Sequence, residues 1–445
     1  MPSTRSFQKL LWTVVFAAGN AGWPFQFRYR GGRHQPRVPE LWTLGRSSAM
    51  STIISIATAF VLLSTVALPY AVAGECASLD QILEQIRAKN KLPALAAAVV
   101  RNGQTIACGA VGFRKVGSPV RVTVMDKWHI GSCTKSMTAA IAGLMVEQEG
   151  WRWDMKVTEM FPDLAREIRP EWQSATLEQF LSQYSGAGSI NDETIDTRLL
   201  TNARKSPLEQ RKLFTRDILI GHAPTVSPGT EWKYDNANYV LVGHAIELKL
   251  KQPWETIIRE RLFKPLGMES AGFGPPANGK AIEQPWGHIL DEAGKLKPIP
   301  PDLTGELAVW DPELAQQIRA DNPAALGPAG RVHCSIGDLA KYVAWQLRGA
   351  RGKGTLLKAA TFTKLQTRYK KEGEYACGWM VEYRDWAGGD AIFHGGSNGT
   401  FTTAIWLAPK MDFAVVVCAN LGGTRCETVV DETAGALIKE YLVND

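Results

Sequence analysis

The apolar positions near residue 80 recur at helical spacing, and a capping pattern precedes them. They are Leu79, Ile82, Leu83 and Ile86. Ser78 followed three residues later by Gln81 is a capping-box pattern, which predicts a helix start. Two β-rich runs, 95–100 and 105–111, then flank Asn102-Gly103, the strongest short signal for a hairpin. We therefore expect a helix and then a β-hairpin.

Helical spacing dominates the middle of the chain. Residues 136–149 carry apolar side chains at that spacing and stop at Gly150, so a helix with a buried face is expected there. Further helices are expected over 177–181, 199–219, 239–250, 254–262 and 336–347. Pro- and Gly-rich connections join them, and the middle is predicted to be mainly helical.

Near the C-terminus the pattern changes to β. Strands are expected over 378–383, 401–407 and 413–419, with Pro409-Lys410-Met411-Asp412 joining the last two, and a final helix over 427–442. Strands from both ends with helices between them predict an α+β fold. We expect one antiparallel sheet built from the two termini and flanked by helices, with an inserted, mainly helical lobe.

The first 73 residues differ from the rest. Residues 51–73 hold no charged residue and end in Ala71-Val72-Ala73-Gly74, a small-x-small pattern, so 50–73 is predicted to be a signal peptide that begins at Met50. The alternative is a retained membrane anchor. Residues 1–49 are interpreted as a disordered extension or a misassigned start, which leaves the true start residue open. Residues 74–445 are expected to form the functional domain, in a periplasmic or secreted protein.

The net charge of +6 comes from the leader. Residues 1–50 hold seven Lys or Arg and one Glu, which leaves 43 basic and 43 acidic residues beyond. Such a neutral body argues against a nucleic-acid partner, which needs a basic face. A membrane contact is expected only if the signal segment is retained.

All seven cysteines follow the proposed cleavage site, so at least one thiol is left unpaired. Cys418 and Cys426 flank a short turn and are candidates for a bridge, with buried free thiols as the alternative for most of the set. The disulfide pairing stays open. The scattered histidines form no His-Glu-x-x-His motif, and there is neither a Cys-x-x-Cys pair nor a phosphate-binding glycine loop. No metal and no cofactor are expected.

Three short motifs carry the candidate chemistry. In Gly131-Ser132-Cys133-Thr134-Lys135, a hydroxyl and an amine three residues apart at a helix start share one face, as a serine nucleophile with a lysine base requires. The spacing alone is weak, because Ser6 and Lys9 repeat it. Downstream lie Tyr234-Asp235-Asn236 and then His394-Gly395-Gly396-Ser397-Asn398. The three motifs in this order are far more specific than any one of them.

With these motifs the chain resembles the serine hydrolases of the penicillin-binding protein and class C β-lactamase superfamily, which includes esterases and D-amino acid peptidases. The resemblance runs from about Ser78 to Leu442 and is supported by Leu266-Gly267-Met268 and Pro328-Ala329-Gly330. It implies that Ser132 is the nucleophile and that Lys135 accepts or relays its proton. A lysine needs a lowered pKa for that role.

The resemblance also assigns the other motif residues. Tyr234 matches the tyrosine that acts as base or proton shuttle, and Asn236 would bind Lys135 and the substrate amide. His394 stands where β-lactamases carry a lysine, and Gly395 and Gly396 would let a strand approach the acyl group. The backbone N–H groups of Ser132 and Ser397 would form the oxyanion hole. A histidine in place of a lysine puts efficient β-lactam turnover in doubt and favours ester or amide hydrolysis.

Each candidate has a structural alternative. Ser132 is also a suitable N-cap, Tyr234 is suited to closing a turn, and His394 is suited to a buried structural role. Lys371-Glu372-Gly373 competes for the third motif, but it lies in a charged run without a following strand. His129-Ile130-Gly131 also fits His-x-Gly and is interpreted as packing support for the nucleophile.

The sequence therefore predicts a secreted serine hydrolase that forms an acyl-enzyme on an ester, amide or β-lactam bond of a small-molecule or peptidoglycan-like substrate. The alternative is a penicillin-binding sensor or binding module that acylates without turnover or is inactive. The segments 187–223 and 273–326, expected to wall the cleft, hold no motif that identifies the acyl donor, and the oligomeric state is equally open.

Overall fold

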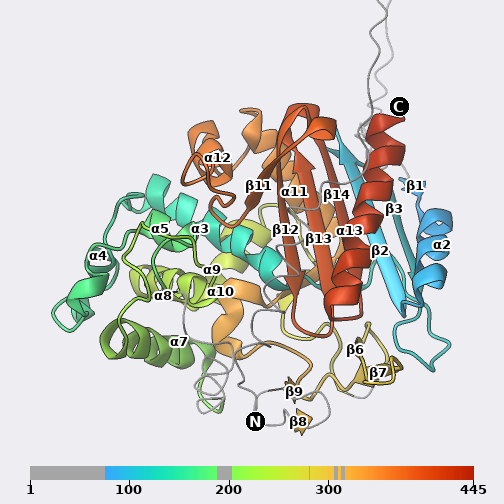
Figure 1. The fold of residues 1–445 in the computed structure, drawn as a ribbon, viewed down its shortest axis with the longest axis horizontal. Coiled ribbons are helices and arrows are strands. Elements are labelled where there is room, and N and C mark those ends of the chain that lie inside the picture. Colours follow the sequence, from blue (N-terminus) through green and yellow to red (C-terminus); the bar gives the residue numbers. More distant parts are fainter. Residues whose placement is uncertain (1–75, 188–202, 280, 305–308, 312–315, 445) are drawn as a thin grey trace, which may run out of the picture. The chain divides into compact units, whose positions relative to one another are not determined.

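Continuous apolar runs such as those of β2 and β14 build a central sheet that both ends of the chain supply (Figure 1). The computed structural model describes residues 76–187, 203–279, 281–304, 309–311 and 316–444. The proposed extension and signal peptide, 1–49 and 50–73, lie outside these residues. The sheet has seven strands in the order β1-β3-β2-β14-β13-β12-β11. Its strands are β1 (Ala77–Ser78), β2 (Ala94–Arg101), β3 (Gln104–Gly112), β11 (Met380–Arg384), β12 (Gly389–Ser397), β13 (Thr402–Ala408) and β14 (Phe413–Ala419).

The expected sheet is confirmed, with one difference in strand direction. β2 pairs antiparallel with β14, so that Leu95 lies opposite Ala419, and this pairing joins the N-terminal hairpin to the C-terminal strands. Asn102 and Gly103 both have positive φ, as the tight turn between β2 and β3 requires. The edge strand β1 runs parallel to β3, which makes the sheet mixed rather than wholly antiparallel.

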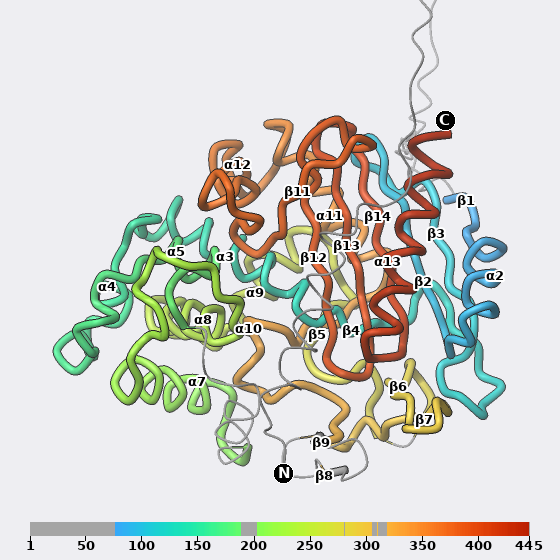
Figure 2. The backbone as a smooth tube through the Cα atoms, in the orientation of Figure 1, coloured from blue at the N-terminus to red at the C-terminus, as the bar shows by residue number. Residues whose placement is uncertain are grey.

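Helices cover both faces of the sheet, and alternate residues of each strand point to opposite faces (Figures 1 and 2). Ala97, Val99 and Val415 face a core shared with the first and last helices, whereas Ala98 and Val416 face the core shared with the helical lobe. The helices are α2 (Asp80–Asn90), α3 (Thr134–Gln148), α4 (Val157–Met160), α5 (Leu177–Leu181), α7 (Pro207–Arg216), α8 (Ala237–Leu250), α9 (Trp254–Ile258), α10 (Gly327–Gly330), α11 (Ile336–Ala350), α12 (Ala359–Gln366) and α13 (Thr424–Ile438).

Shorter elements connect and extend these helices and strands. Three small sheets contain β4 (Lys127–His129), β5 (Gly272–Phe273) and β10 (Val332–Ser335); β6 (Gly287–Leu290) and β7 (Leu296–Ile299); and β8 (Val309–Asp311) and β9 (Gln316–Ile318). Single turns of 3₁₀ helix are η1 (Gly131–Cys133), η2 (Pro162–Leu164), η3 (Pro170–Trp172), η7 (Ala324–Leu326), η8 (Asp385–Ala387) and η9 (Pro409–Met411). Turns of π helix are η4 (Asp217–Gly221), η5 (Arg259–Phe263) and η10 (Lys439–Val443).

Most of the predicted helices are confirmed, but two local details are wrong. Ser78 belongs to β1 and does not cap with Gln81; its Oγ accepts a hydrogen bond from the N–H of Asp80 at 3.2 Å, and α2 begins there. The expected strand ranges did not include 389–397, but the resemblance places the His394-Gly395-Gly396 motif on a strand, and β12 does run through it for nine residues. Within the expected helix 199–219, the structure describes α7 and η4, and residues 199–202 lie outside the described ranges.

The cysteines pair differently from the suggested bridge. Cys76 and Cys108 form a disulfide that ties the start of the described chain to β3. Cys418 and Cys426 are buried free thiols, so the alternative holds for both. Cys133, Cys334 and Cys377 are also buried and free.

Candidate active site

Ser132 lies where strand β4 ends and α3 begins. It occupies the single turn η1, and Gly131 before it has φ +48°, in the left-handed region that favours glycine. The first three turns of α3, from Thr134 to Met145, are buried throughout. A helix packed on all sides holds its first turn still, so the serine sits on a rigid support.

Lys135 is fully buried directly behind this serine. Its Nζ donates to Ser132 Oγ at 2.9 Å, to Asn236 Oδ1 at 2.7 Å and to the Ala329 carbonyl at 2.9 Å. These contacts match the three N–H donors of an ammonium group. The structure thus brings Asn236, which directly precedes α8, to Ser132 and Lys135, although 101 residues separate Asn236 from Lys135. The Pro328-Ala329-Gly330 motif was noted in the sequence, but the contact of the Ala329 backbone oxygen with Lys135 was not predicted, because a backbone oxygen leaves no side-chain pattern.

Tyr234 lies beside this amine, half-buried just before α8. The Lys135 Nζ is 4.9 Å from the centroid of the Tyr234 ring, within the range of a cation–π contact. The ring centroid of His394 is 6.3 Å from that of Tyr234. The phenol therefore belongs to the same cluster as the serine, the lysine and the histidine.

Gln183 fixes the turn that carries Tyr234. Its carbonyl accepts from the N–H of Lys233 at 2.8 Å, and its Oε1 accepts from the N–H of Asp235 at 3.0 Å and from Asn238 Nδ2 at 2.6 Å. Gln183 is fully buried and has φ +67°, an uncommon conformation for a residue other than glycine. Gln183 thus holds both neighbours of Tyr234 in place. The sequence did not predict these contacts, because no local pattern distinguishes residue 183.

His394 is buried in β12, and both of its ring nitrogens contact protein atoms. Nδ1 contacts the Gly395 carbonyl, which can only accept, so Nδ1 carries the proton. Nε2 then accepts from the Tyr375 hydroxyl at 3.0 Å. Burial, and next the charge of Lys135, lower the pKa of His394 to about 3. The imidazole is therefore neutral near pH 7 and brings no positive charge to the cleft.

The last residues of β12 pack their backbone against η1. A Cβ added to Gly396 would overlap the Ile130 carbonyl and lie 3.0 Å from the Ser132 nitrogen, and one added to Gly131 would overlap the Ser397 nitrogen. A Cβ at Gly395 would meet open space. The Ser397 hydroxyl donates to the Phe401 carbonyl at 2.9 Å. It is therefore the backbone of Ser397, rather than its hydroxyl, that lies against the nucleophile turn.

Cys133, next to the serine, is not suited to act as a nucleophile. Its Sγ lies 3.4 Å from the His394 carbonyl, to which it donates. Complete burial raises the pKa of this thiol far above its usual value. A neutral, buried thiol is inert compared with a thiolate, so Ser132 has no competitor at this helix start.

Two further sequence candidates, the 371–373 motif and His129, are not among the hydrogen-bond acceptors of the Lys135 amine named above. Lys371 and Glu372 are exposed in a turn. His129 is fully buried and contacts Asp321, whose side chain is also buried.

Of the expected cleft walls, 187–223 and 273–326, several parts lie outside the described ranges. Within the described ranges, no group of three or more His, Cys, Asp or Glu side chains is placed so that it could hold a metal ion. None of the described helices combines the length and apolar character needed to cross a membrane.

Known proteins share this architecture. Protein flp of Staphylococcus aureus strain N315 is 26% identical over 357 residues, which is 79% of this chain and 64% of that protein, so the chain spans less than two thirds of this relative. The octameric penicillin-binding protein homologue of Pyrococcus abyssi superposes with a TM-score of 0.63 at 23% identity, covering 81% of this chain and 78% of the other.

A D-stereospecific amidohydrolase from a Streptomyces species superposes with a TM-score of 0.58 at 19% identity, covering 80% of this chain and 96% of the other. At such identities the two structural matches concern the fold alone. The family comparison concerns the sequence itself: the beta-lactamase family model matches residues 79–439, which is most of the chain. This protein belongs to the beta-lactamase family, whose members are generally serine hydrolases.

Proposed function

We propose that the protein hydrolyses an ester or amide bond through an acyl-enzyme at Ser132. The observation that carries the proposal is the 2.9 Å contact between Lys135 Nζ and Ser132 Oγ, in a position where the amine is fully buried. A nucleophile and a base within hydrogen-bond reach, with the base oriented by further groups, are the signature of an activated serine. Asn236 and the Ala329 carbonyl are those orienting groups.

The proton transfers follow from this geometry. In its neutral form Lys135 takes the hydroxyl proton as Ser132 Oγ bonds to the substrate carbonyl carbon, and the carbonyl oxygen becomes an oxyanion. The Ser132 and Ser397 N–H groups stabilise that charge. Lys135 passes that proton to the neighbouring Tyr234, and Tyr234 gives its own hydroxyl proton to the leaving alcohol or amine as its bond to carbon breaks, so that both groups return to their starting forms. Water then attacks the acyl carbon and gives a proton to Lys135. The relay returns a proton to Ser132 Oγ as its bond to the acyl carbon breaks, which releases the acid and the free serine.

The third motif supports a substrate without a carboxylate at this position. A lysine there would offer a cation, whereas His394 is neutral and both of its ring nitrogens contact protein atoms. Penicillins carry a carboxylate that such a cation would pair with. We therefore propose simple esters or amides, including D-amino acid amides, as substrates in preference to β-lactams. The fold shared with a D-stereospecific amidohydrolase supports the amide class.

The nucleophile is tested by labelling with a fluorophosphonate probe. Ser132→Ala is expected to abolish both labelling and hydrolysis of p-nitrophenyl acetate. Ser206→Ala is the matched control, because Ser206 also stands at a helix start and accepts from the Glu209 N–H at 3.3 Å. This control should label like the parent protein. Labelling that survives in Ser132→Ala contradicts the proposal.

The substrate class is tested with a panel of p-nitrophenyl esters, D-amino acid p-nitroanilides and nitrocefin. Turnover of an ester or amide with little turnover of nitrocefin is expected. Rapid nitrocefin hydrolysis would contradict the interpretation of His394. Acylation by one equivalent of ester without release would identify the sensor alternative instead.

We also propose that the protein is exported. The Cys76–Cys108 disulfide supports this proposal, because structural disulfides persist in oxidising compartments. Expression of the full chain with N-terminal sequencing of the periplasmic or secreted product is the test. A new N-terminus at Gly74 is expected, and a product confined to the cytoplasm would contradict export.

A further inference from the structure

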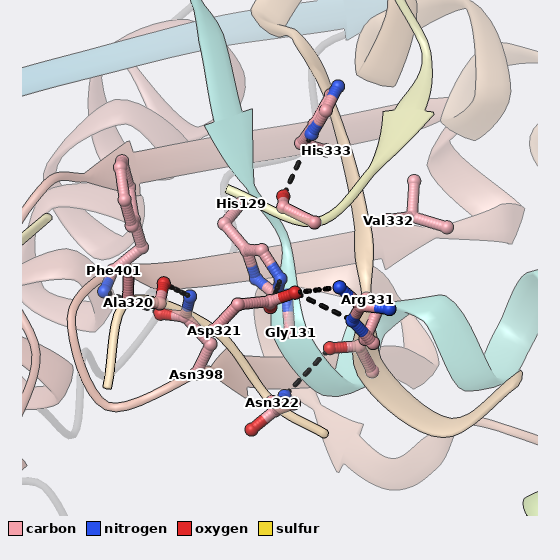
Figure 3. A network of polar contacts seen from close by, with 12 residues as sticks. His129, Gly131, Ala320, Asp321, Asn322, Arg331, Val332, His333, Asn398 and Phe401 are labelled. Carbon is pink, nitrogen blue, oxygen red and sulfur yellow. Dashed lines mark hydrogen bonds and ion pairs between the residues drawn. The ribbon is translucent and has the colours of Figure 1, made fainter. Parts of the chain in front are cut away.

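A fully buried imidazole three residues before the nucleophile binds the backbone that presents it (Figure 3). His129 Nδ1 accepts a hydrogen bond from the Gly131 N–H at 3.1 Å. Since Nδ1 uses its lone pair there, the ring proton is on Nε2, which lies 2.8 Å from Asp321 Oδ1. The acceptor atom faces the residue that immediately precedes Ser132.

A second layer of contacts fixes this ring. Arg331 Nε donates to Asp321 Oδ2 at 2.6 Å, so the carboxylate is held from its other side. Despite complete burial, which alone would raise it, the pKa of Asp321 is lowered, and the charge of Arg331 is the main cause. Asp321 therefore stays ionised and polarises the imidazole, which makes Nδ1 a stronger acceptor. The main-chain oxygen of His129 accepts from Thr403 Oγ1 at 3.2 Å, which anchors the same residue to β13.

The geometry of the Gly131–Ser132 peptide depends on this acceptor. Gly131 has φ +48°, and its α-carbon lies so close to β12 that an added Cβ would overlap the Ser397 nitrogen. The bond to His129 is a local restraint on this turn, comparable to an Asx-turn in which a side chain binds the N–H two residues on. Rotation of the peptide would displace the Ser132 N–H and Oγ together.

We propose that His129, braced by Asp321 and Arg331, is a positioning residue that sets the Ser132 nucleophile and its oxyanion-hole N–H through the Gly131 N–H. The inference rests on the proposed function of Ser132 and deepens it. This role differs from packing support, because the reaction requires the acceptor atom Nδ1 of His129 rather than the volume of its ring. A misplacement of about 1 Å costs about 100-fold in rate, as does loss of one oxyanion donor.

Two matched substitutions separate the contacts of the ring. His129→Asn retains an acceptor near the Nδ1 position and loses the contact with Asp321. His129→Gln retains a donor near the Nε2 position and loses the acceptor for Gly131. We expect His129→Asn to keep kcat on p-nitrophenyl acetate within about 5-fold of the parent, and His129→Gln to lower kcat by about 100-fold. KM should change by less than about 3-fold in both, because acyl binding is not altered.

Thermal unfolding of each variant is measured beside its kinetics, with rates taken per folded, fluorophosphonate-reactive site. Asp321→Asn serves as a second probe, since it keeps an acceptor for Nε2–H but removes the charge; kcat should fall by about 10-fold. Equal kcat in the Asn and Gln variants, or a loss confined to KM or to melting temperature, overturns the inference. Labelling that persists in Ser132→Ala would instead overturn the proposed function, so the two failures are distinguishable.

Discussion

Buried histidines should make this protein lose stability at mildly acidic pH, and His288 offers the sharpest measurement. Its Nε2 accepts from the Val116 N–H at 3.0 Å and its Nδ1 lies 2.8 Å from the Asn420 carbonyl, so the folded ring is neutral. Burial, opposed by the bond to Asn420, lowers its pKa from 6.5 to about 4. His333 has a pKa of about 4 and His394 one of about 3 for the same main reason.

The sign follows from proton counting. Between the folded pKa of about 4 and the unfolded value of 6.5, the unfolded chain binds the proton and the folded chain does not. Stability therefore falls as the pH drops through this window. At pH 5 one such histidine costs about 2 kcal/mol relative to pH 8, and three cost about 6 kcal/mol. That sum is comparable to the whole stability of a typical domain, about 5–15 kcal/mol.

Carboxylates with raised pKa oppose this trend. Burial raises the pKa of Glu427 and of Asp431, so these groups bind protons more readily in the folded state and stabilise it as the pH falls. These two groups reduce the pH dependence that the histidines give, whereas carboxylates with a lowered pKa, such as Glu247 and Asp321, add to it. A comparison of parent and His288→Gln removes this background, because both chains share the carboxylates.

Urea unfolding at pH 8, 7, 6 and 5 is the assay for both chains. His288→Gln should be less stable than the parent at pH 8, because it loses a fitted pair of hydrogen bonds. The gap should then narrow by about 2 kcal/mol by pH 5, since glutamine does not titrate. Parallel stability curves over this range would refute the buried neutral state of His288.

Three further predictions concern the site and its supports. Gly396→Ala should lower both the melting temperature and fluorophosphonate labelling, because the added Cβ would overlap the Ile130 carbonyl. Gly395→Ala is the control and should fold like the parent, because its Cβ would meet open space. An equal fall in melting temperature and labelling in both variants would contradict the contact between β12 and η1. Arg211→Met should lower the free energy of unfolding in urea by about 3–5 kcal/mol, since the fully buried guanidinium binds Glu247 and Glu255. A decrease below about 1 kcal/mol would show that these ion pairs contribute little to stability. Replacing both Cys76 and Cys108 by Ser should cost about 4 kcal/mol of stability, because 32 residues separate the two; an unchanged melting temperature under oxidising conditions would contradict that.

The parts of the fold that follow periodic patterns could be predicted from the sequence. The hairpin around Asn102-Gly103, the strand Phe413–Ala419 and the helix Leu177–Leu181 lie where alternation or helical spacing placed them. The range of β12 was not predicted from the pattern, because the strand ends in His394-Gly395-Gly396-Ser397 and glycine has low strand propensity; only the resemblance placed this motif on a strand. The parallel pairing of β1 was also missed, since a two-residue edge strand carries no pattern of its own.

The motif residues could be named from the sequence, but their supports could not. Ser132, Lys135 and Asn236 were identified by spacing and order, and the structure joins them by hydrogen bonds. The Ala329 carbonyl and Gln183 were not identified, because a backbone oxygen and a lone buried amide contact the site only through the tertiary fold. A local pattern records which residues share an element, whereas these contacts join elements far apart in sequence.

The neutral state of His394 depends on its partner Tyr375 as well as on the histidine itself. Tyr375 is fully buried, and burial raises the pKa of its phenol well above the usual value, so it stays a donor to His394 Nε2. That donor occupies the lone pair that a second proton would need, and Lys135 opposes a second positive charge nearby. A lysine at residue 394 would enter the same buried position beside Lys135 and face the same repulsion. The proposed preference for substrates without a carboxylate at this position therefore depends on the surroundings of β12 as well as on residue 394.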